Sequence, residues 1–560
     1  MTLASRAFGT FLKLPAALTR HVFVESDIAV TAPDGATLLT DVYLAQTSRR
    51  GQDQPLPTIL IRSPYGRGNP YGLAARLFAE RGYHAVVQSA RGTFGSGGEI
   101  DTEREAGDGR ATADWIIEQP WSNGELGAFG GSYLSFTQLA LASTRPPQLK
   151  AMALGVWGAD RRAGYYPGGS FALDRALNWT YGVSQQERSR LALLRPGRGL
   201  EPALDHLPLL DADVLAAGHP VGFYRDWLEH DEPGDPYWTP TDFRPMLPTL
   251  GIPITMIAGW YDLFLPLMLA DYQALRAAGQ PVRLQIGAWR HASPVMFRHS
   301  LQDALDWFAV HLRHQPPDQH HDQDQDQVEG PPPIDVEVMG GPGWHQVPDW
   351  PPAASTERWH LQPGHALSPA SPVASEPDLY RYDPAEPTPS VGGTSTGPDS
   401  GPKDNRELEA RPDVLTFSTE PLGAPVEIIG PVQAELYVTS SLAHTDFFAR
   451  LCDVDPKGRS TNVTDGILRL TEDAWSSGPV LVDLWPTAYQ FQPGHRIRLQ
   501  VSSGAHPRFA RNPGTGERLA PATSLKVAEQ TVYHDPDHPS AILLPVVSPA
   551  ADPSAADLRA

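Results

Sequence analysis

The sequence predicts a doubly wound α/β sheet that is interrupted by a helical insert and followed by an all-β domain. Short apolar runs alternate with helical segments over residues 22–145 and again over residues 246–315, which is typical of a mostly parallel sheet covered by helices. Residues 146–245 are rich in Leu, Ala, Arg and Asp, show helical periodicity and contain no strong β run. Over residues 334–550 strand-like runs are separated by proline and glycine turns, which predicts a β-sandwich.

The first α/β segment supplies four expected elements. The pattern predicts a strand with a turn, two buried strands and an amphipathic helix, over residues 28–35, 58–61, 84–88 and 101–119 in that order. Ala113, Ile116 and Ile117 form the apolar face expected for this helix. Residues 301–312 form a second amphipathic segment near the end of the sheet.

A glycine-flanked serine lies where an apolar strand over residues 125–129 turns into a helix over residues 133–142. Gly130-Gly131-Ser132 matches the nucleophile elbow, a strained turn that holds a serine hydroxyl clear of the sheet. The next amide, that of Tyr133, then points at the same space and is suited to bind an oxyanion. The alternative interpretation of Ser132 is a simple helix N-cap.

Two further residues follow candidate strands in the order that a hydrolase triad requires. Asp262 comes just after the apolar run 253–258, and His291 comes just after the run 282–286. Among 19 histidines and 65 acidic residues, each alone is more simply a turn or loop residue. The chain order Ser, Asp, His, with each residue past a strand, is that of the α/β-hydrolase arrangement.

Two segments are expected to flank the catalytic sheet. The helical insert over residues 146–245 is expected to form a cap over the active site. Residues 316–333, dominated by Asp, Gln and Pro, are expected to be a flexible linker. The spacing of His320 and His321 in this linker matches no metal geometry, so no metal site is predicted. Residues 392–402 are interpreted as a second flexible stretch.

Composition excludes several function classes. The net charge of −21 disfavours binding to nucleic acid, whose phosphates it would repel. The single cysteine, Cys452, allows no intrachain disulfide, and no apolar run is long enough to span a membrane. A poor signal-peptide pattern at the N-terminus leaves a cytoplasmic enzyme as the expectation. The glycine-rich loop over residues 92–98 lacks the ending of a phosphate loop, so no cofactor is predicted.

These motifs resemble the cocaine-esterase-like hydrolases (the CocE/NonD family), which are related to X-prolyl dipeptidyl-peptidases and to α-amino ester acylases. The resemblance covers nearly the whole chain. It is carried by the segments 61–66, 88–98, 119–121, 127–133, 259–262, 289–291, 445–451, 465–466, 501–503, 507–509 and 511–513. It implies an α/β-hydrolase fold with an inserted helical cap and a C-terminal jelly-roll-like sandwich.

The resemblance also implies roles for matching residues. Ser132 is expected to be the nucleophile, His291 the general base and acid, and Asp262 the carboxylate that orients the histidine. The Tyr65 hydroxyl and the Tyr133 amide are expected to bind the oxyanion; without the resemblance, Tyr65 is more simply a packing residue beside Pro64. Substrate-pocket candidates are Tyr165, Trp179 and Phe264, with Leu436 and Tyr437 as weaker ones. Ser135 departs from the glycine usual in the family, and a residue this small should be tolerated.

The expected function is hydrolysis of a carboxylic ester with a bulky or aryl acyl group, through an acyl-enzyme. The expected partner is a small-molecule ester or amide, without nucleic acid or membrane, and a homo-oligomer stays possible. The alternative is release of X-Pro dipeptides, or α-amino ester and amide acylase chemistry, which needs carboxylates to hold an α-ammonium. A hypothesis of a different class is a non-catalytic ligand-binding protein that keeps the hydrolase fold.

Overall fold

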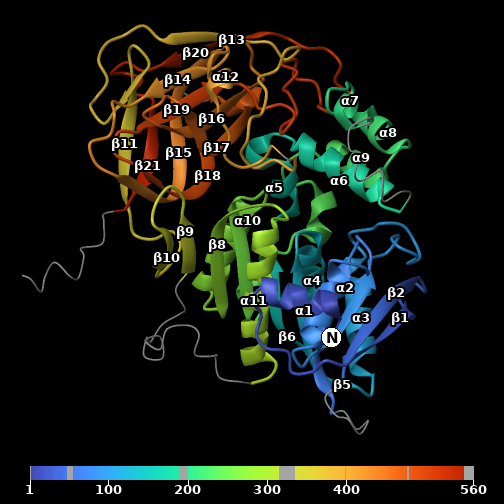
Figure 1. Cartoon of the computed structure of the whole chain (residues 1–560). Helices are drawn as coiled ribbons and strands as arrows, with labels where there is room; N and C mark the ends of the chain where they lie inside the picture. Colours follow the sequence, from blue (N-terminus) through green and yellow to red (C-terminus); the bar gives the residue numbers. More distant parts are fainter. Residues whose placement is uncertain are drawn as a thin grey trace, which may run out of the picture.

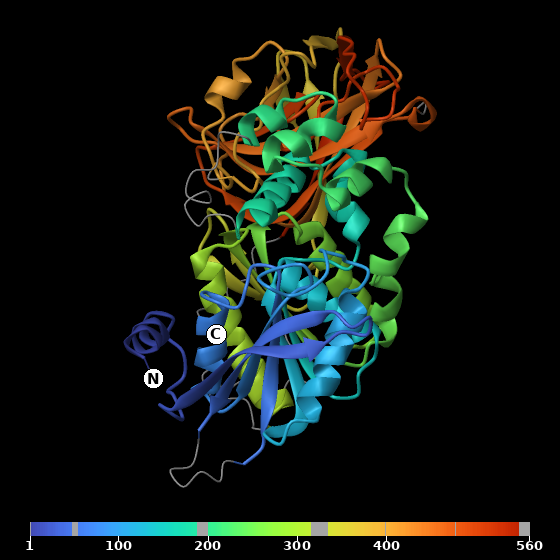
Figure 2. The same cartoon turned by 90° about the vertical axis from the view of Figure 1, so that its right-hand side faces the viewer.

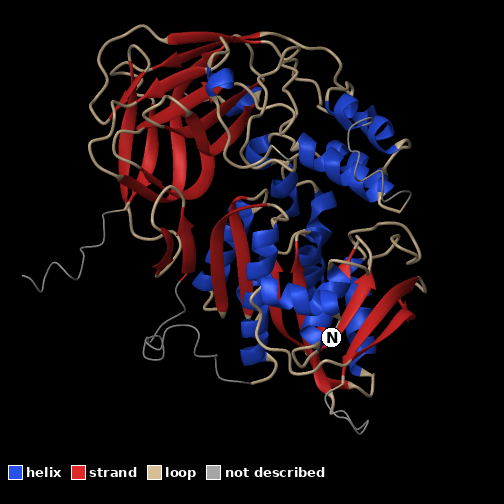
Figure 3. Ribbon diagram, viewed as in Figure 1, coloured by secondary structure: helices blue, strands red, loops and turns tan. Residues whose placement is uncertain are grey.

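The computed structural model describes residues 2–46, 54–187, 200–314, 334–397, 399–475 and 478–547. The expected linker over residues 316–333, with His320 and His321, lies outside the described residues. Two large sheets dominate the structure, one flanked by helices and the other forming an all-β unit (Figures 1 and 3). The inserted helices lie beside the all-β unit, and both lie over one end of the first sheet (Figures 1 and 2).

The first sheet has ten strands, most of them parallel. Pairing is parallel from β4 through β3, β5, β6, β7 and β8 to β9, and antiparallel at both edges. In spatial order the strands are β1 (Val22–Thr31), β2 (Thr37–Ala45), β4 (His84–Ser89), β3 (Leu56–Ser63), β5 (Ser122–Gly131), β6 (Leu149–Gly155), β7 (Ile254–Tyr261), β8 (Val282–Arg290), β9 (Ile334–Val338) and β10 (Gly343–Val347).

Helices cover both faces of this sheet, because alternate strand residues point to opposite sides. Ile59 and Ile61 pack with α2 and α11, whereas Leu60 between them packs with α3 and α4. The covering helices are α2 (Tyr71–Ala79), α3 (Glu105–Ile117), α4 (Tyr133–Ser143), α10 (Leu265–Ala277) and α11 (Pro294–His311), and α1 (Leu3–Phe11) packs against α2. On α3, Ala113 and Ile116 are buried as expected, but Ile117 is 40% exposed and lies outside the apolar face.

The helical insert begins later than the sequence predicts. Residues 149–155, expected within the insert, form the buried central strand β6, whose alanines and lysine give a weak β signal. The insert then consists of short helices: α5 (Arg161–Tyr165), η1 (Pro167–Gly169), α6 (Leu173–Gln185), α7 (Leu200–Leu204), η2 (Leu209–Asp211), α8 (Ala212–Ala217), α9 (Gly222–Glu229), η3 (Pro236–Thr241) and η4 (Arg244–Thr249). Residues 188–199 of the insert lie outside the described residues.

The second sheet forms the all-β unit around its own apolar core. Its strands are β11 (Ser355–Gln362), β12 (Ala366–Ser368), β13 (Asp378–Tyr382), β14 (Leu415–Ser418), β15 (Val426–Ser440), β16 (Thr445–Val454), β17 (Ser460–Leu470), β18 (Val480–Phe491), β19 (Arg496–Ser502), β20 (Ala528–Tyr533) and β21 (Ala541–Val546), with α12 (Arg406–Glu409) and η6 (Glu472–Ala474) between strands. The strands β9 and β10, which the sequence pattern places in this unit, extend the first sheet instead.

The insert and the all-β unit are joined by backbone hydrogen bonds. The Asp174 amide donates to the Pro507 carbonyl at 3.0 Å, and the Ala510 amide donates to the Phe171 carbonyl at 2.8 Å. The turn of η1 packs directly on β17: a Cβ added to Gly168 would lie 1.8 Å from the carbonyl oxygen of Ile467. The insert is therefore held between the two sheets at a fixed position above the end of β5.

Candidate active site

Ser132 lies at the carboxyl end of β5, in the strained turn that begins α4. Its φ of 59° and ψ of −130° are unfavourable for a residue with a side chain. The turn is closed by the Ser132 amide, which donates to the Gly155 carbonyl at 2.8 Å. Gly130 is required here, since a Cβ at this position would lie 2.5 Å from the Leu134 Cβ. The strained, glycine-flanked turn from strand to helix that the sequence predicts is therefore present.

Three predicted side chains meet in one hydrogen-bonded chain. The Ser132 Oγ lies 3.0 Å from the His291 Nε2, and the His291 Nδ1 lies 2.7 Å from the Asp262 Oδ2. Asp262 is fully buried, and its other oxygen accepts a hydrogen bond from the Phe264 amide at 2.9 Å. The carboxylate only accepts, so the Nδ1 carries the proton and the Nε2 lone pair faces the serine hydroxyl.

Tyr65 and Tyr133 lie beside this chain. The Trp179 indole N–H donates to the Tyr65 hydroxyl at 3.1 Å. Burial raises the pKa of Tyr65 to about 12, opposed by hydrogen bonding with Trp179 and Ser132, so the phenol keeps its proton. Tyr133 is the first residue of α4, where helix geometry leaves the amide N–H without an intrahelical acceptor. Two donors are thus available close to the serine oxygen.

Tyr133 also has a buried side chain behind the elbow. Its hydroxyl donates to the Glu105 Oε1 at 2.9 Å, and Glu105 pairs with the buried Arg62 at 2.7 Å. Burial raises the pKa of Glu105, while the charge of Arg62 lowers it. This network anchors the start of α4 to α3 and to β3.

A cavity of about 220 Å³ opens beside Ser132 and His291. Tyr165, Trp179 and Phe264 line it, as the sequence predicts. Sequence reasoning missed the other wall residues: Thr102, Phe136, Trp157, Arg161, Arg175, Asn178, Trp227, Leu263 and Thr396. One signal was available, because Arg161 with Tyr165 and Arg175 with Trp179 are both spaced by four residues and share a helix face.

Two predicted pocket residues lie elsewhere. Leu436 is fully buried in the core of the all-β unit, and its neighbour Tyr437 packs its ring against His538. Both are on β15, which pairs with β18, β20 and β21 and does not reach the catalytic cavity. The all-β unit instead contributes Thr396, which comes from the stretch interpreted as flexible. That stretch is tied by reciprocal hydrogen bonds between Gly393 and Gly401, each of 2.8 Å.

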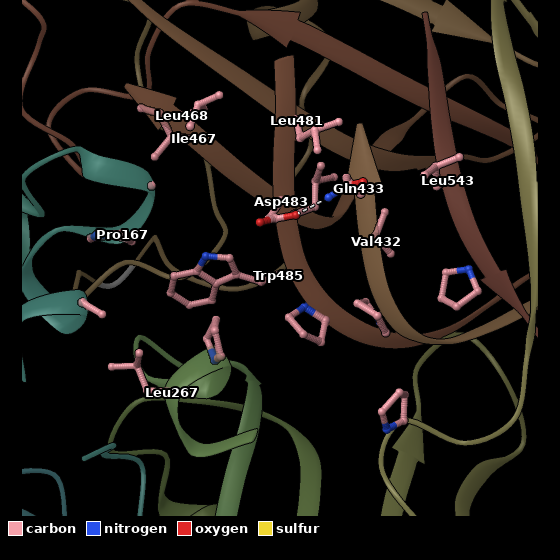
Figure 4. A pocket seen from close by; sticks show the side chains of 18 of the residues that line it. Pro167, Leu267, Val432, Gln433, Ile467, Leu468, Leu481, Asp483, Trp485 and Leu543 are labelled. Atoms are coloured by element: carbon pink, nitrogen blue, oxygen red, sulfur yellow. Dashed lines mark hydrogen bonds between the residues drawn. The ribbon is translucent and has the colours of Figure 1, made fainter. Parts of the chain in front are cut away.

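A larger cavity of about 760 Å³ lies between the insert, α10 and the all-β unit (Figure 4). Its walls are mainly apolar, with Pro167, Leu267, Val432 and Trp485 among them, and it contains none of the three hydrogen-bonded residues. Leu263 lines both cavities. Ser132 and His291 therefore line the smaller cavity and not this larger one.

The described ranges contain neither a cluster of metal ligands nor a membrane-spanning helix. No group of three or more His, Cys, Asp or Glu is placed to share a metal ion there. No described helix combines the length and the apolar character needed to cross a bilayer.

The sequence matches two family profiles that together span most of the chain. Residues 34–293 match the X-Pro dipeptidyl-peptidase (S15 family) profile, and residues 326–543 match that of the X-Pro dipeptidyl-peptidase C-terminal non-catalytic domain. Among curated proteins, the chain is 32% identical to a cocaine esterase of Rhodococcus sp., over 94% of this chain and 98% of that protein.

Solved structures share the whole architecture. An α-amino acid ester hydrolase superposes with a TM-score of 0.77 at 24% identity, covering 95% of this chain and 98% of that one. An aminopeptidase from a marine sediment Thaumarchaeota archaeon superposes with a TM-score of 0.76 at 23% identity, covering 94% and 97% of the two chains. At these identities the likeness shows the fold.

Proposed function

The chain belongs to the cocaine-esterase-like (CocE/NonD) serine hydrolases of the S15 family, and on that premise we propose that Ser132, His291 and Asp262 are its catalytic triad. The observation that carries the proposal is the continuous hydrogen-bonded chain from the Ser132 Oγ through the imidazole to Asp262, with spacings of 3.0 and 2.7 Å. Both distances are within reach for proton transfer.

The reaction is acyl transfer in two steps. The His291 Nε2 takes the Ser132 proton as the Oγ attacks the substrate carbonyl carbon, and a tetrahedral oxyanion forms. His291 then gives that proton to the leaving alcohol as the carbon–oxygen bond breaks. Water repeats the sequence on the acyl-enzyme and releases the acid. The buried Asp262 stabilises the imidazolium that forms in each step.

The Tyr65 hydroxyl and the Tyr133 amide are the proposed oxyanion donors. The support for Tyr65 is its fixed position, since the Trp179 indole holds the phenolic oxygen at 3.1 Å. A preorganised donor of this kind stabilises the transition state by about 3 kcal/mol.

We propose a carboxylic ester as the substrate in preference to an X-Pro peptide or an α-amino ester. Recognition of a free α-ammonium requires carboxylates close to the carbonyl site. No Asp or Glu lines the catalytic cavity among the described residues, whereas aromatic rings line much of it. A ring-lined pocket without carboxylates suits the acyl part of an ester.

The triad assignment is tested with Ser132→Ala. Its kcat should fall by about three to six orders of magnitude, and labelling by a fluorophosphonate probe should disappear. Ser143→Ala, a change at the end of the same helix, is the matched control and should label and turn over like the wild type. Near-normal turnover by Ser132→Ala would refute the assignment.

The bond preference is tested by comparing para-nitrophenyl benzoate with an Ala-Pro para-nitroanilide. The proposal expects kcat/KM to favour the ester. Faster cleavage of the peptide anilide would instead support the dipeptidyl-peptidase alternative. Absence of probe labelling in the wild type, together with no turnover of either compound, would favour the non-catalytic alternative.

A further inference from the structure

The catalytic cavity carries a positive charge in a strongly negative protein. Its lining contains two arginines, Arg161 and Arg175, and no Asp or Glu among the described residues, although the chain as a whole has a net charge of −21. Both arginines are buried, at 4% and 7% exposure. A guanidinium stays charged even in such surroundings, so each brings a full positive charge to the cavity wall.

Arg175 is held by rings that leave its donors unused. Its guanidinium carbon lies 4.4 Å from the centre of the Tyr165 ring and 4.8 Å from that of the Phe264 ring. These contacts cover the faces of the guanidinium, whereas the N–H groups lie in its plane. The Nε and Nη2 atoms are buried and have no hydrogen-bond partner in the described structure. Buried donors of this kind normally have an acceptor.

The nearest carboxylates are committed to other partners. Asp174 accepts hydrogen bonds from the Ser395 hydroxyl and the Thr396 amide, at 3.0 and 3.2 Å. Asp262 forms hydrogen bonds with the His291 imidazole and with the Phe264 amide. Neither forms an ion pair with Arg175, so the charge of Arg175 has no direct counter-ion among the described residues.

Arg161 adds a second charge on the neighbouring helix. Its Nη1 donates to the Thr102 hydroxyl at 2.8 Å, and its guanidinium lies over the rings of Phe136 and Trp227. It too has no carboxylate partner in the parts of the chain described. The four-residue spacing places Arg161 with Tyr165 on α5 and Arg175 with Trp179 on α6, so each helix presents one cation and one ring to the cavity.

We propose that this cavity binds an acyl group that carries its own carboxylate, as in a half-ester of a dicarboxylic acid, and that Arg175 binds that carboxylate. The inference rests on the proposed ester hydrolase function. Arg175 supplies parallel N–H donors, a geometry that matches a carboxylate, and Arg161 reinforces the positive potential. The enclosed position beside Phe264, whose ring centre lies 5.7 Å from that of His291, places the anion in the acyl part of the substrate. The leaving group then departs on the side where His291 is 20% exposed.

The test compares two esters that share a leaving group: para-nitrophenyl hydrogen adipate, which is anionic, and the neutral para-nitrophenyl hexanoate. The wild type should show the higher kcat/KM with the adipate. Arg175→Gln should lower the adipate-to-hexanoate ratio of kcat/KM by about tenfold to a hundredfold, the loss expected for a charged hydrogen bond. Arg381→Gln, which changes an exposed arginine of the all-β unit, is the matched control and should keep the wild-type ratio.

If Arg175→Gln fails to fold, inhibition of the wild-type enzyme provides a second test of the anionic pocket. Free adipate should inhibit the wild type competitively, at lower concentrations than its neutral diamide. Equal inhibition, an unchanged ratio in a folded Arg175→Gln, or a wild-type preference for hexanoate would overturn the anionic pocket. If the enzyme prefers an anionic ester only when the carboxylate is on the leaving group, the placement of the carboxylate in the acyl part of the substrate is overturned. Hydrolysis of hexanoate in all these cases would leave the proposed function standing, whereas no hydrolysis of either ester and no fluorophosphonate labelling would reject the function itself.

Discussion

Ser135 follows Ser132, the proposed nucleophile, by one helical turn and forms hydrogen bonds to the ends of two strands. Its Oγ lies 2.7 Å from the Gly130 carbonyl and 2.9 Å from the Gly155 carbonyl, and it accepts a hydrogen bond from the Gly155 amide at 2.9 Å. The same Gly155 carbonyl accepts the Ser132 amide. We expected Ser135 only to be tolerated in place of glycine. Its buried hydroxyl instead forms hydrogen bonds that a glycine, which has no side chain, could not form.

The proposed role of Tyr65 depends on one group, its phenolic hydroxyl. We expect Tyr65→Phe to lower kcat by about a hundredfold to a thousandfold, because one oxyanion donor is lost. With the pKa of Tyr65 raised to about 12, this donor should persist throughout the usual assay range of pH. Steady-state kinetics on para-nitrophenyl benzoate measure the effect. Tyr71→Phe is the control, because the Tyr71 ring stacks on that of Tyr65, with 6.2 Å between the ring centres, and does not line the cavity. The kcat of this variant should stay within a few fold of the wild-type value. Equal losses in both variants would contradict the role.

Asp271 should make the stability of the protein depend on pH. It is 6% exposed on α10, and its Oδ2 accepts the Ala159 amide at 2.6 Å. Burial raises the pKa of Asp271 to about 8, from an ordinary value of 3.8. Between these values the folded protein holds a proton that the unfolded chain has released. The free energy of unfolding should therefore fall as pH rises through this window, by up to about 1.4 kcal/mol per pH unit.

Asp271→Asn tests this dependence, since an amide oxygen still accepts the Ala159 amide and does not ionise. The variant should gain stability relative to wild type as pH rises from about 5 to about 8, in urea unfolding measured at each pH. Parallel curves for the two proteins would show that the carboxyl of Asp271 does not titrate in this range.

At the scale of elements, the close contact between η1 and β17 is possible because Gly168 has no side chain. Gly168 has a φ of 57°, and an added Cβ would lie 1.8 Å from the Ile467 carbonyl oxygen. Gly168→Ala should destabilise the protein by about 1–3 kcal/mol, or loosen the insert enough to raise KM. Thermal unfolding and KM measure these effects. Gly182→Ala on α6, where a Cβ meets no atom within 4 Å, is the control and should be neutral or slightly stabilising. A wild-type result for Gly168→Ala would contradict the tight contact.

The elements that the sequence predicts best are those with strong apolar signals. The expected strands 58–61 and 84–88 correspond to β3 and β4, whose residues are β-branched or apolar and buried. The strand β6 was missed because Ala151 and Ala153 have low β propensity, and its burial between β5 and β7 comes from tertiary packing. The strands β9 and β10 were assigned to the wrong sheet, since strand periodicity contains no information about the pairing partner.

At the scale of the whole molecule, the meeting of Ser132, Asp262 and His291 was predictable from the sequence, and the rest of the cavity largely was not. The chain order of Ser132, Asp262 and His291 past strand ends has a strong sequence signature. Arg161 and Arg175 have only the weak signal of their four-residue spacing from Tyr165 and Trp179, and arginines in short polar helices are usually solvated. Their burial results from the stacking of the insert between two sheets, which brings together residues distant in sequence.

The position of Thr396 in the cavity wall has a consequence for protein engineering. Thr396 belongs to the C-terminal third of the chain, yet it lines the catalytic cavity, and with Ser395 it holds the Asp174 that precedes Arg175. The proposed substrate cavity is thus composite, since its lining comes from both α/β segments, the insert and the C-terminal third. A chimaera that exchanges only the C-terminal third with that of a homologue would carry a different selectivity, with every triad atom unchanged.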